Sequence, residues 1–158
     1  MSATEPQAPS PSFSIEKLYV KDISLEVPHG PQVFLEPLNP QLEVQVRNEA
    51  AQFADGLFEV VVTVTVTARA GDKPVFLAEA AQAGIFAVRG VPANDLEPLL
   101  GVGCPTILFP YAREAISDLV MRAGFPPVVL QPISFEQLYL ERKRREAAGD
   151  GSRAEIAG

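Results

Sequence analysis

The chain contains one cysteine, Cys104, and one histidine, His29, the two side-chain types that often pair as a nucleophile and its base. Cys104 lies in "GVGCPTI", directly before a predicted helix, and a helix N-terminus lowers the pKa of a thiol. His29 lies in a proline-rich stretch with no evident carboxylate to orient it. Because free cysteines are mostly small buried side chains, the pattern favours a structural Cys104. A small enzyme that uses this thiol remains the alternative.

Other reaction chemistries lack the residues they need. One cysteine and one histidine make a poor zinc site. The sequence contains no GxxxxGK phosphate loop, no GxGxxG fingerprint and no nucleophile-elbow serine. We therefore expect no catalytic residue, no metal and no cofactor, and a protein that binds rather than reacts.

Charge and cysteine content limit the partners and the compartment. Thirteen basic and 20 acidic residues give a net charge of -7, which argues against nucleic acid or an anionic membrane as the main partner. Residues 1–141 hold 17 acids and 8 bases, a net of -9, whereas residues 142–158 hold 5 bases and 3 acids. A single cysteine, with no apolar leader or membrane span, indicates a soluble cytoplasmic protein. We expect a protein partner that carries a basic patch.

The clearest element is the segment "LFEVVVTVTVTA" at residues 57–68. Its residues alternate between two faces with period two, as in a β-strand with one buried face. The apolar face carries Phe58, Val60, Val62, Val64, Val66 and Ala68, and the polar face carries Glu59, Thr63, Thr65 and Thr67. We expect a central strand whose valine face packs on helices and whose threonine face is part of a flat polar surface.

Three further strands and a long loop surround it in the sequence. Strands are predicted near residues 13–27, 42–50 and 75–88, with turns at Asp55-Gly56 and Gly71-Asp72. In the first strand, Asp22, Ser24 and Glu26 alternate with Ile23 and Leu25, which indicates an acidic outer face. The stretch from Pro28 to Gln41 contains four prolines, which exclude helix and central strand. This long crossover loop is therefore a candidate functional segment.

Two helices follow the strands. Apolar residues recur at helical spacing through residues 105–123, and Gly124 can end that helix. Ser134 and Gln137 have the spacing of a capping box, which predicts a second helix from residue 135. The order predicts an α+β fold: a four-stranded antiparallel sheet with a long crossover loop, packed on two C-terminal helices. We expect a disordered tail at residues 1–12, one domain at 13–145 and a flexible tail at 146–158.

Several segments resemble the bacterial protein-export chaperone family SecB. The resemblance covers roughly residues 13–140 in order, through "YVKDISLEVP", "GPQVFLEPLNP", "LFEVVVTVTVTA", "GCPTILFPYARE" and "FPPVVLQPISFEQLY". It implies a cytoplasmic homotetramer, a dimer of dimers, that uses no nucleotide. Such a chaperone holds non-native precursor proteins and delivers them to SecA, the motor of the Sec export pathway. The broad apolar stripe of the first long helix also favours an oligomer.

The resemblance also implies site residues. A client-binding groove would be lined by the crossover-loop residues Val33, Phe34, Leu35 and Leu38. SecA would contact Asp22, Glu26, Leu77 and Glu79, and the contact between dimers would lie near Ala78, Ala80 and Gln82.

Two departures from the family leave questions open. Many relatives carry tryptophan where this chain has Leu38, which reduces the area for stacking but keeps the position apolar. The C-terminal tail does not clearly match the family pattern, so its contact with SecA is an open question. A SecB-like chaperone dedicated to an antitoxin client is an alternative with the same fold.

Overall fold

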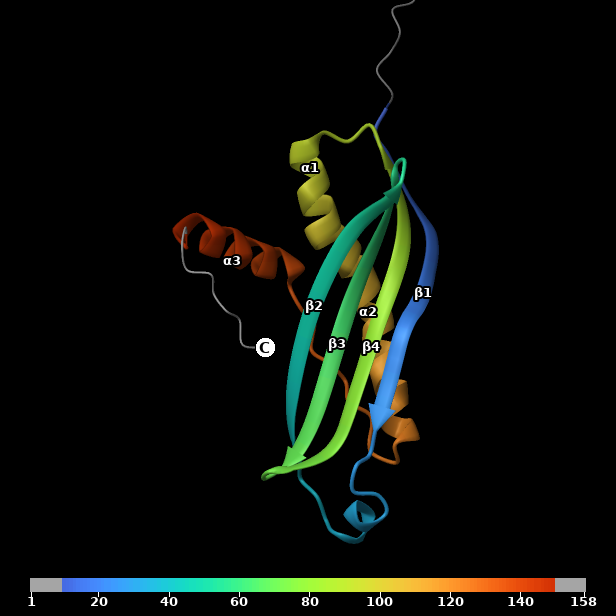
Figure 1. Cartoon of the computed structure of the whole chain (residues 1–158), viewed down its shortest axis with the longest axis vertical. Helices are drawn as coiled ribbons and strands as arrows, with labels where there is room; N and C mark the ends of the chain where they lie inside the picture. The colour runs from blue at the N-terminus through green and yellow to red at the C-terminus, as the bar shows by residue number, and fades with distance from the viewer. Residues whose placement is uncertain (1–9, 150–158) are drawn as a thin grey trace, which may run out of the picture.

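The computed structural model describes residues 10–149 and confirms the α+β fold (Figure 1). One antiparallel sheet has the strand order β1-β4-β3-β2. Its strands are β1 (Ser12–Glu26), β2 (Gln41–Ala54), β3 (Leu57–Ala70) and β4 (Lys73–Arg89). Because β1 pairs with β4, the chain must cross from one sheet edge to the other between β1 and β2. The proline-rich crossover makes this connection.

The central strand β3 behaves as its alternation predicts. Val60, Val62, Val64 and Val66 have no exposed surface, because their face is covered by a helix. The opposite face carries the threonines, and there Val61 and Thr63 are also buried. The helix-side face of β3 thus lies in the core as expected, whereas the opposite face, which faces away from α2, is not an open polar surface at Val61 and Thr63.

Strand β1 contains two register shifts, at Ile15/Lys17 and at Val20/Asp22. Each shift inserts an extra residue and exchanges the faces to which the following side chains point. This explains why only the end of the strand, from Asp22 to Glu26, shows clear alternation in the sequence. After the second shift, Ile23 and Leu25 point toward the helix-covered face.

One long helix, α2 (Cys104–Arg122), covers β3 and β4 on one side of the sheet. It follows the short helix α1 (Ala93–Pro98) and the single π-helical turn η2 (Leu99–Gly103). A side chain at Gly84 of β4 would lie 2.7 Å from the Phe86 ring and 3.0 Å from Leu108 of α2. The missing Cβ therefore lets α2 approach the sheet closely.

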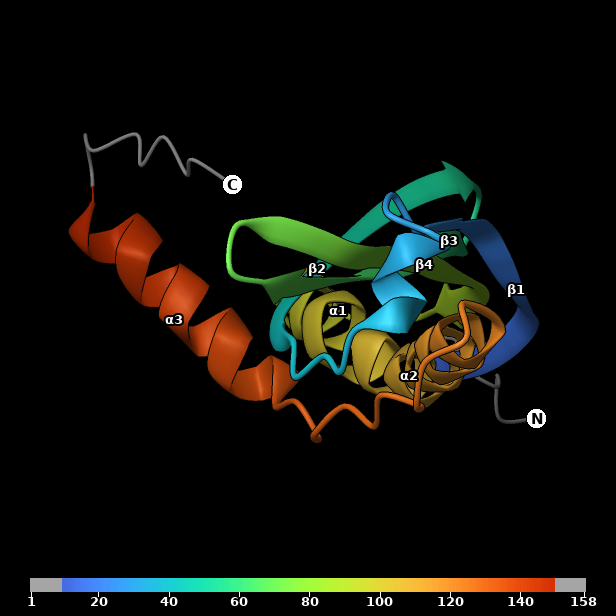
Figure 2. The same ribbon diagram turned by 90° about the horizontal axis from the view of Figure 1, so that it is seen from below.

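The last helix, α3 (Phe135–Ala148), leaves the body of the molecule (Figure 2). The Ser134 hydroxyl accepts a hydrogen bond of 3.2 Å from the Gln137 N–H, which confirms one half of the predicted capping box. Phe135 is buried edge-to-face against Phe109 of α2, with 5.9 Å between ring centroids. Beyond this anchor α3 packs on η2, whereas α2 alone forms the large contact with the sheet.

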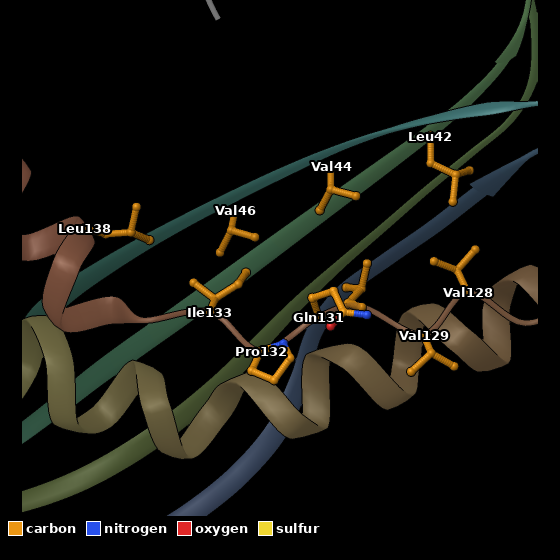
Figure 3. Close-up of a pocket in the computed structure, with 10 residues that line it drawn as sticks. Leu42, Val44, Val46, Val128, Val129, Gln131, Pro132, Ile133 and Leu138 are labelled. Atoms are coloured by element: carbon orange, nitrogen blue, oxygen red, sulfur yellow. The ribbon is translucent and has the colours of Figure 1, made fainter.

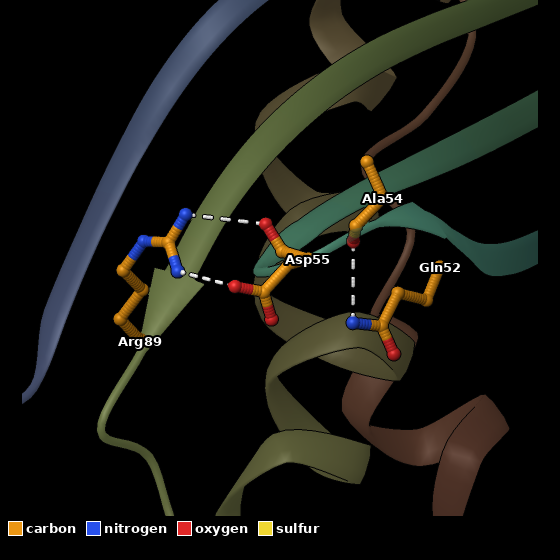
Figure 4. A network of polar contacts seen from close by, with 4 residues as sticks. All are labelled: Gln52, Ala54, Asp55 and Arg89. Atoms are coloured by element: carbon orange, nitrogen blue, oxygen red, sulfur yellow. Dashed lines mark hydrogen bonds and ion pairs between the residues drawn. The ribbon is translucent and has the colours of Figure 1, made fainter.

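The Asp55-Gly56 turn joins β2 to β3 and is fixed to the end of β4 (Figure 4). Arg89 contacts the Asp55 carboxylate at 3.3 Å and its carbonyl oxygen at 3.1 Å. Gly56 has a φ of +67°, which favours glycine. A second contact, from the Gln52 amide to the Ala54 carbonyl oxygen at 3.2 Å, spans the irregular end of β2.

Three expectations about element bounds are corrected. The crossover contains one turn of 3-10 helix, η1 (Gln32–Leu35), where the prolines suggested no helix. Pro31 is the N-cap of this turn, a position where no N–H is needed. Strand β2 runs to Ala54 rather than residue 50, and α3 runs to Ala148, into the segment predicted as a tail. Strand β1 begins at Ser12, the last residue of the predicted N-terminal tail. Residues 1–9 and 150–158 of the two predicted tails lie outside the described residues.

Candidate client groove and partner surface

An apolar groove lies between β2 and the extended segment at residues 128–133 (Figure 3). Its volume is about 530 Å³. Leu42, Val44 and Val46 project from β2 toward this segment. The opposite wall and the end are formed by Val128, Val129, Leu130, Gln131, Pro132, Ile133 and Leu138.

The groove exists because α2 is too narrow to cover the whole sheet. Leu42 and Val44 pair with Ala68 and Val66 of β3 and so point to the same face as the core. However, α2 lies over β3 and β4, and the apolar side chains of the edge strand β2 stay open: Leu42 is 46% exposed and Val44 is 44% exposed. A row of exposed apolar side chains beside a free strand edge is typical of a site for an extended peptide.

The four crossover-loop residues lie at one end of the molecule and differ in exposure. Val33 is buried and Leu38 is partly buried against the core, whereas Leu35 is 84% exposed and Phe34 is 52% exposed. Phe34 stacks on Phe125, with 5.3 Å between ring centroids. None of the four lines this groove, but Phe125 lies three residues before Val128, where the wall segment begins.

The groove residues of β2 could not be recognised from the alternation of their sequence alone. Leu42, Val44 and Val46 alternate with polar residues, and this pattern predicts only that they share one face. A usable signal was the combination of this strand with the extended apolar stretch "PPVVLQPI", which has no helical partner of its own. Both are apolar segments that a single long helix cannot cover.

The residues predicted to contact SecA all lie on the open face of the sheet. Glu26 pairs with Leu77, and Ser24 pairs with Glu79, so these side chains share a face with Asp22. This face is opposite to the one that α2 covers. The structure thus brings together two acidic residues of β1 with one acidic and one apolar residue of β4.

Neighbouring residues define the charge on this face. The Thr65 hydroxyl donates a hydrogen bond of 2.7 Å to the Glu79 carboxylate and orients it. Farther along the sheet, Glu59 accepts hydrogen bonds from the Lys21 ammonium, at 2.6 Å, and from the Tyr19 hydroxyl. Within residues 10–149, Asp22, Glu26 and Glu79 form no ion pair, so no cation neutralises these three carboxylates.

Ala78, Ala80 and Gln82 lie on the other face of β4. All three are at most 5% exposed, on the side of the sheet that carries the core. Their role at a contact between dimers stays a prediction.

Cys104 is fully buried at the start of α2, and burial raises the pKa of its thiol to about 12. A nucleophilic thiol needs a lowered pKa instead. His29 lies just before η1. The Phe34 ring of η1 would lie 3.1 Å from a Cβ at Gly124, just beyond the C-terminal end of α2, whereas Cys104 begins this helix. A helix of 19 residues is roughly 28 Å long, so the two groups are not a catalytic pair.

Among the described residues, none of the helices has the length and apolar character required to cross a bilayer. The same part of the chain contains no group of three or more side chains that could hold a metal ion.

A family model described as "Preprotein translocase subunit SecB" matches residues 6–146. The chain is 58% identical over 144 residues to protein-export protein SecB of Chromobacterium violaceum, with 91% of this chain and 96% of the relative covered. It is 59% identical to the protein-export protein SecB of Aromatoleum aromaticum, with 84% of each chain covered. The Neisseria gonorrhoeae protein of the same name is 54% identical, over 88% of this chain and 95% of its own length.

A solved structure shares the fold. It is the SecB-like chaperone of Mycobacterium tuberculosis in complex with a peptide from an antitoxin, with a TM-score of 0.64, 17% identity, and coverage of 77% of this chain and 91% of that chain. The relatives above 50% identity are named for protein export instead. An antitoxin-dedicated role is therefore not favoured, and the chain belongs to the SecB family of protein-export chaperones.

Proposed function

We propose that this chaperone binds non-native precursor proteins in the bacterial cytoplasm along the groove between β2 and residues 128–133. The observation that carries this proposal is the row of exposed Leu42 and Val44 side chains facing an extended apolar wall. Unfolded segments expose apolar side chains that such a groove can cover. Phe34 and Leu35 of the crossover loop would extend the apolar surface beyond the groove.

The edge of β2 adds a second source of affinity. Strand β2 pairs only with β3 among the described strands, so its outer backbone N–H and C=O groups are free. An extended client segment could pair with them in the manner of an added strand. Backbone pairing does not depend on the client sequence, and this accounts for a chaperone that accepts many clients without ATP.

A charge inserted in the groove tests the proposal. Val44→Lys places an ammonium group among the apolar side chains, and we expect at least about tenfold weaker binding of an unfolded precursor, because the client must then desolvate a charge. Gln45→Lys is the matched control: it adds the same charge at the next residue, on the opposite face of β2. Titration calorimetry with full-length protein and a denatured precursor measures both. Equal affinities for the two variants would place client binding elsewhere.

We also propose that the open face around Asp22, Glu26, Leu77 and Glu79 docks SecA. Support comes from two sources: the family resemblance that singled out these residues, and the pairing that gathers them on one face. Carboxylates on a flat sheet suit a partner with a basic patch.

A homotetramer is the third part of the proposal. Support comes from β1, the other edge strand, whose apolar side chains Phe13, Ile15, Val20 and Ile23 are each at least 40% exposed. An exposed apolar edge strand favours pairing with another chain, and a symmetric dimer would cover this one.

A further inference from the structure

A hollow of about 290 Å³ lies on the open face of the sheet, the face that also carries the acidic residues proposed to dock SecA. All four strands contribute to its lining, which consists of Tyr19, Ala51, Phe53, Glu59 and Ile85. Ala51, Glu59 and Ile85 pair with one another across β2, β3 and β4 and form a row. Since β1 and β2 are the edge strands, Tyr19 and Phe53 flank the hollow from opposite sides.

The two flanking side chains are aromatic. Phe53 lies in the irregular end of β2 and is 55% exposed. Tyr19 pairs with Ala83, and this small residue lets the phenol cross β4 and reach Glu59 on β3. Within residues 10–149, no Arg or Lys lies over either ring. The exposed Phe53 ring is therefore free to contact a cation from outside the chain.

The carboxylate of Glu59 is only partly used by its neighbours. Its Oε1 accepts a hydrogen bond of 2.6 Å from the Lys21 ammonium, and its Oε2 accepts one from the Tyr19 hydroxyl. A carboxylate has about four acceptor sites, so each oxygen keeps capacity for another donor. The Glu59 side chain is 23% exposed, which leaves it accessible from the hollow.

Other charged side chains of the open face lie near the hollow without lining it. They are Lys17, Arg47 and Glu49, and within residues 10–149 none of them forms an ion pair. Positive and negative charges are thus mixed in this part of the face. What distinguishes the hollow is the combination of a carboxylate with an exposed aromatic ring, which suits an Arg or Lys side chain.

We propose that the hollow receives one Arg or Lys side chain of SecA, which lies against the Phe53 ring and donates a hydrogen bond to the Glu59 carboxylate. The inference rests on the proposed docking of SecA on the open face and adds a second anchor to it. Glu59 lies six residues from Thr65, the hydrogen-bond partner of Glu79, so the two contacts are roughly 20 Å apart along β3. A basic patch of that length would reach both.

Neutralising the carboxylate is the first test, by titration calorimetry of full-length protein with purified SecA at low salt. Glu59→Gln should weaken SecA binding about fivefold, because a charge-assisted hydrogen bond becomes a neutral one. Glu49→Gln is the matched control: it removes the same charge from the same face, next to Val61 rather than in the hollow. Equal effects of the two substitutions would show that only the overall charge matters, and would overturn the proposal.

The aromatic ring is tested separately. Phe53→Leu keeps an apolar side chain but removes the ring, and we expect about threefold weaker SecA binding from the lost cation–π contact. Because Phe53 is more than half exposed, thermal unfolding should be nearly unchanged. Wild-type affinity in Phe53→Leu would show that no cation rests on this ring, and would contradict the proposed occupant.

Lys21 gives a prediction of the opposite sign. Lys21→Met removes the cation that shares the Glu59 carboxylate, so SecA should bind about threefold more tightly, as for an exposed ion pair. Arg47→Met is the control, since it removes one positive charge beside Thr63, four residues from Glu59 along β3 or roughly 13 Å away. Equal gains for both variants would indicate long-range electrostatics alone and count against the hollow.

The variant with Asp22→Lys and Glu26→Lys separates this inference from the proposed docking site. If it loses SecA binding while Glu59→Gln and Phe53→Leu bind SecA like wild type, the hollow is excluded and docking at the acidic residues stands. If wild-type protein does not bind SecA at all, both are excluded. Loss of affinity in all three variants, with a gain in Lys21→Met, is the expected result.

Discussion

At the scale of single residues, the Tyr19–Glu59–Lys21 network on the open sheet face keeps the Tyr19 phenol protonated and the Glu59 carboxyl ionised. The hydrogen bond with Glu59, followed by burial, raises the pKa of Tyr19 from 10.0 to about 12. The hydrogen bonds that Glu59 accepts from Lys21 and then from Tyr19 hold the pKa of this carboxyl below its ordinary value of 4.5. Both shifts favour the same state, a neutral phenol bound to a carboxylate, across the whole neutral range.

The network makes a prediction at alkaline pH. A raised pKa in the fold means that the contribution of the protonated phenol to stability is complete below pH 10 and disappears as the pH rises to about 12. Absorbance titration should therefore show a phenol transition of Tyr19 near pH 12. We expect Tyr19→Phe to remove this transition and Glu59→Gln to move it toward pH 10. A late transition that persists in Tyr19→Phe would assign it to another tyrosine.

At the scale of elements, Gly124 links the end of α2 to the crossover loop. Its φ is +89°, and a Cβ there would lie 3.1 Å from the Phe34 ring. Gly124→Ala should thus lower the free energy of unfolding by roughly 1–2 kcal/mol from backbone strain, with a further loss from the displaced ring.

Gly71→Ala is the matched control for this variant. Gly71 has a φ of +62°, but nothing lies within 4 Å of a Cβ at that position. Urea denaturation of the two variants should show the greater loss for Gly124→Ala, and only this variant should weaken client binding through Phe34. Equal losses, with client binding unchanged, would show that the Phe34 contact is unimportant.

The same scale shows how far the sequence could predict this fold and its sites. Strands and turns follow from alternation and from Gly56 and Gly71, which are local signals. The client groove does not, because the exposure of Leu42 and Val44 depends on the width of the sheet relative to α2. The candidate partner surface was predictable only in part. Alternation places Asp22 and Glu26 on an outer face, but their proximity to Leu77 and Glu79 depends on strand pairing across some fifty residues.

At the scale of the whole molecule, the groove lies apart from the other two candidate surfaces, which share strand β1 but use side chains on opposite faces of the sheet. The groove lies on the helix side of the sheet at β2, and the acidic residues lie on the open face at β1 and β4. The exposed apolar residues of β1 lie at the opposite edge of the sheet from β2. A chaperone with this arrangement could hold a client in the groove while its open face docks on SecA. Variants of one surface should then leave the other functions unchanged.

This separation leads to a prediction for Asp22→Lys combined with Glu26→Lys. The two residues are four apart on β1, roughly 13 Å by the rise of a strand, and the open face points to solvent, so folding should not depend on them. Reversal removes attraction toward a basic partner and adds repulsion, for which we expect a loss of SecA affinity of at least about tenfold. Light scattering should give the variant the same mass as wild type, which for the proposed tetramer is 68 kDa, four times 17.0 kDa. Client binding should be unchanged.

The control reverses two other exposed acids, Glu136 and Glu141 on α3, and so alters the net charge by the same amount away from the open face. If local charge on the open face guides docking, only the β1 variant loses SecA binding. Wild-type affinity should also fall as salt rises, because at 0.1 M salt charges separated by more than about 10 Å are largely screened. Calorimetry at low salt that gave the β1 variant wild-type affinity would show that Asp22 and Glu26 are merely solvated, and would move the SecA contact to another surface.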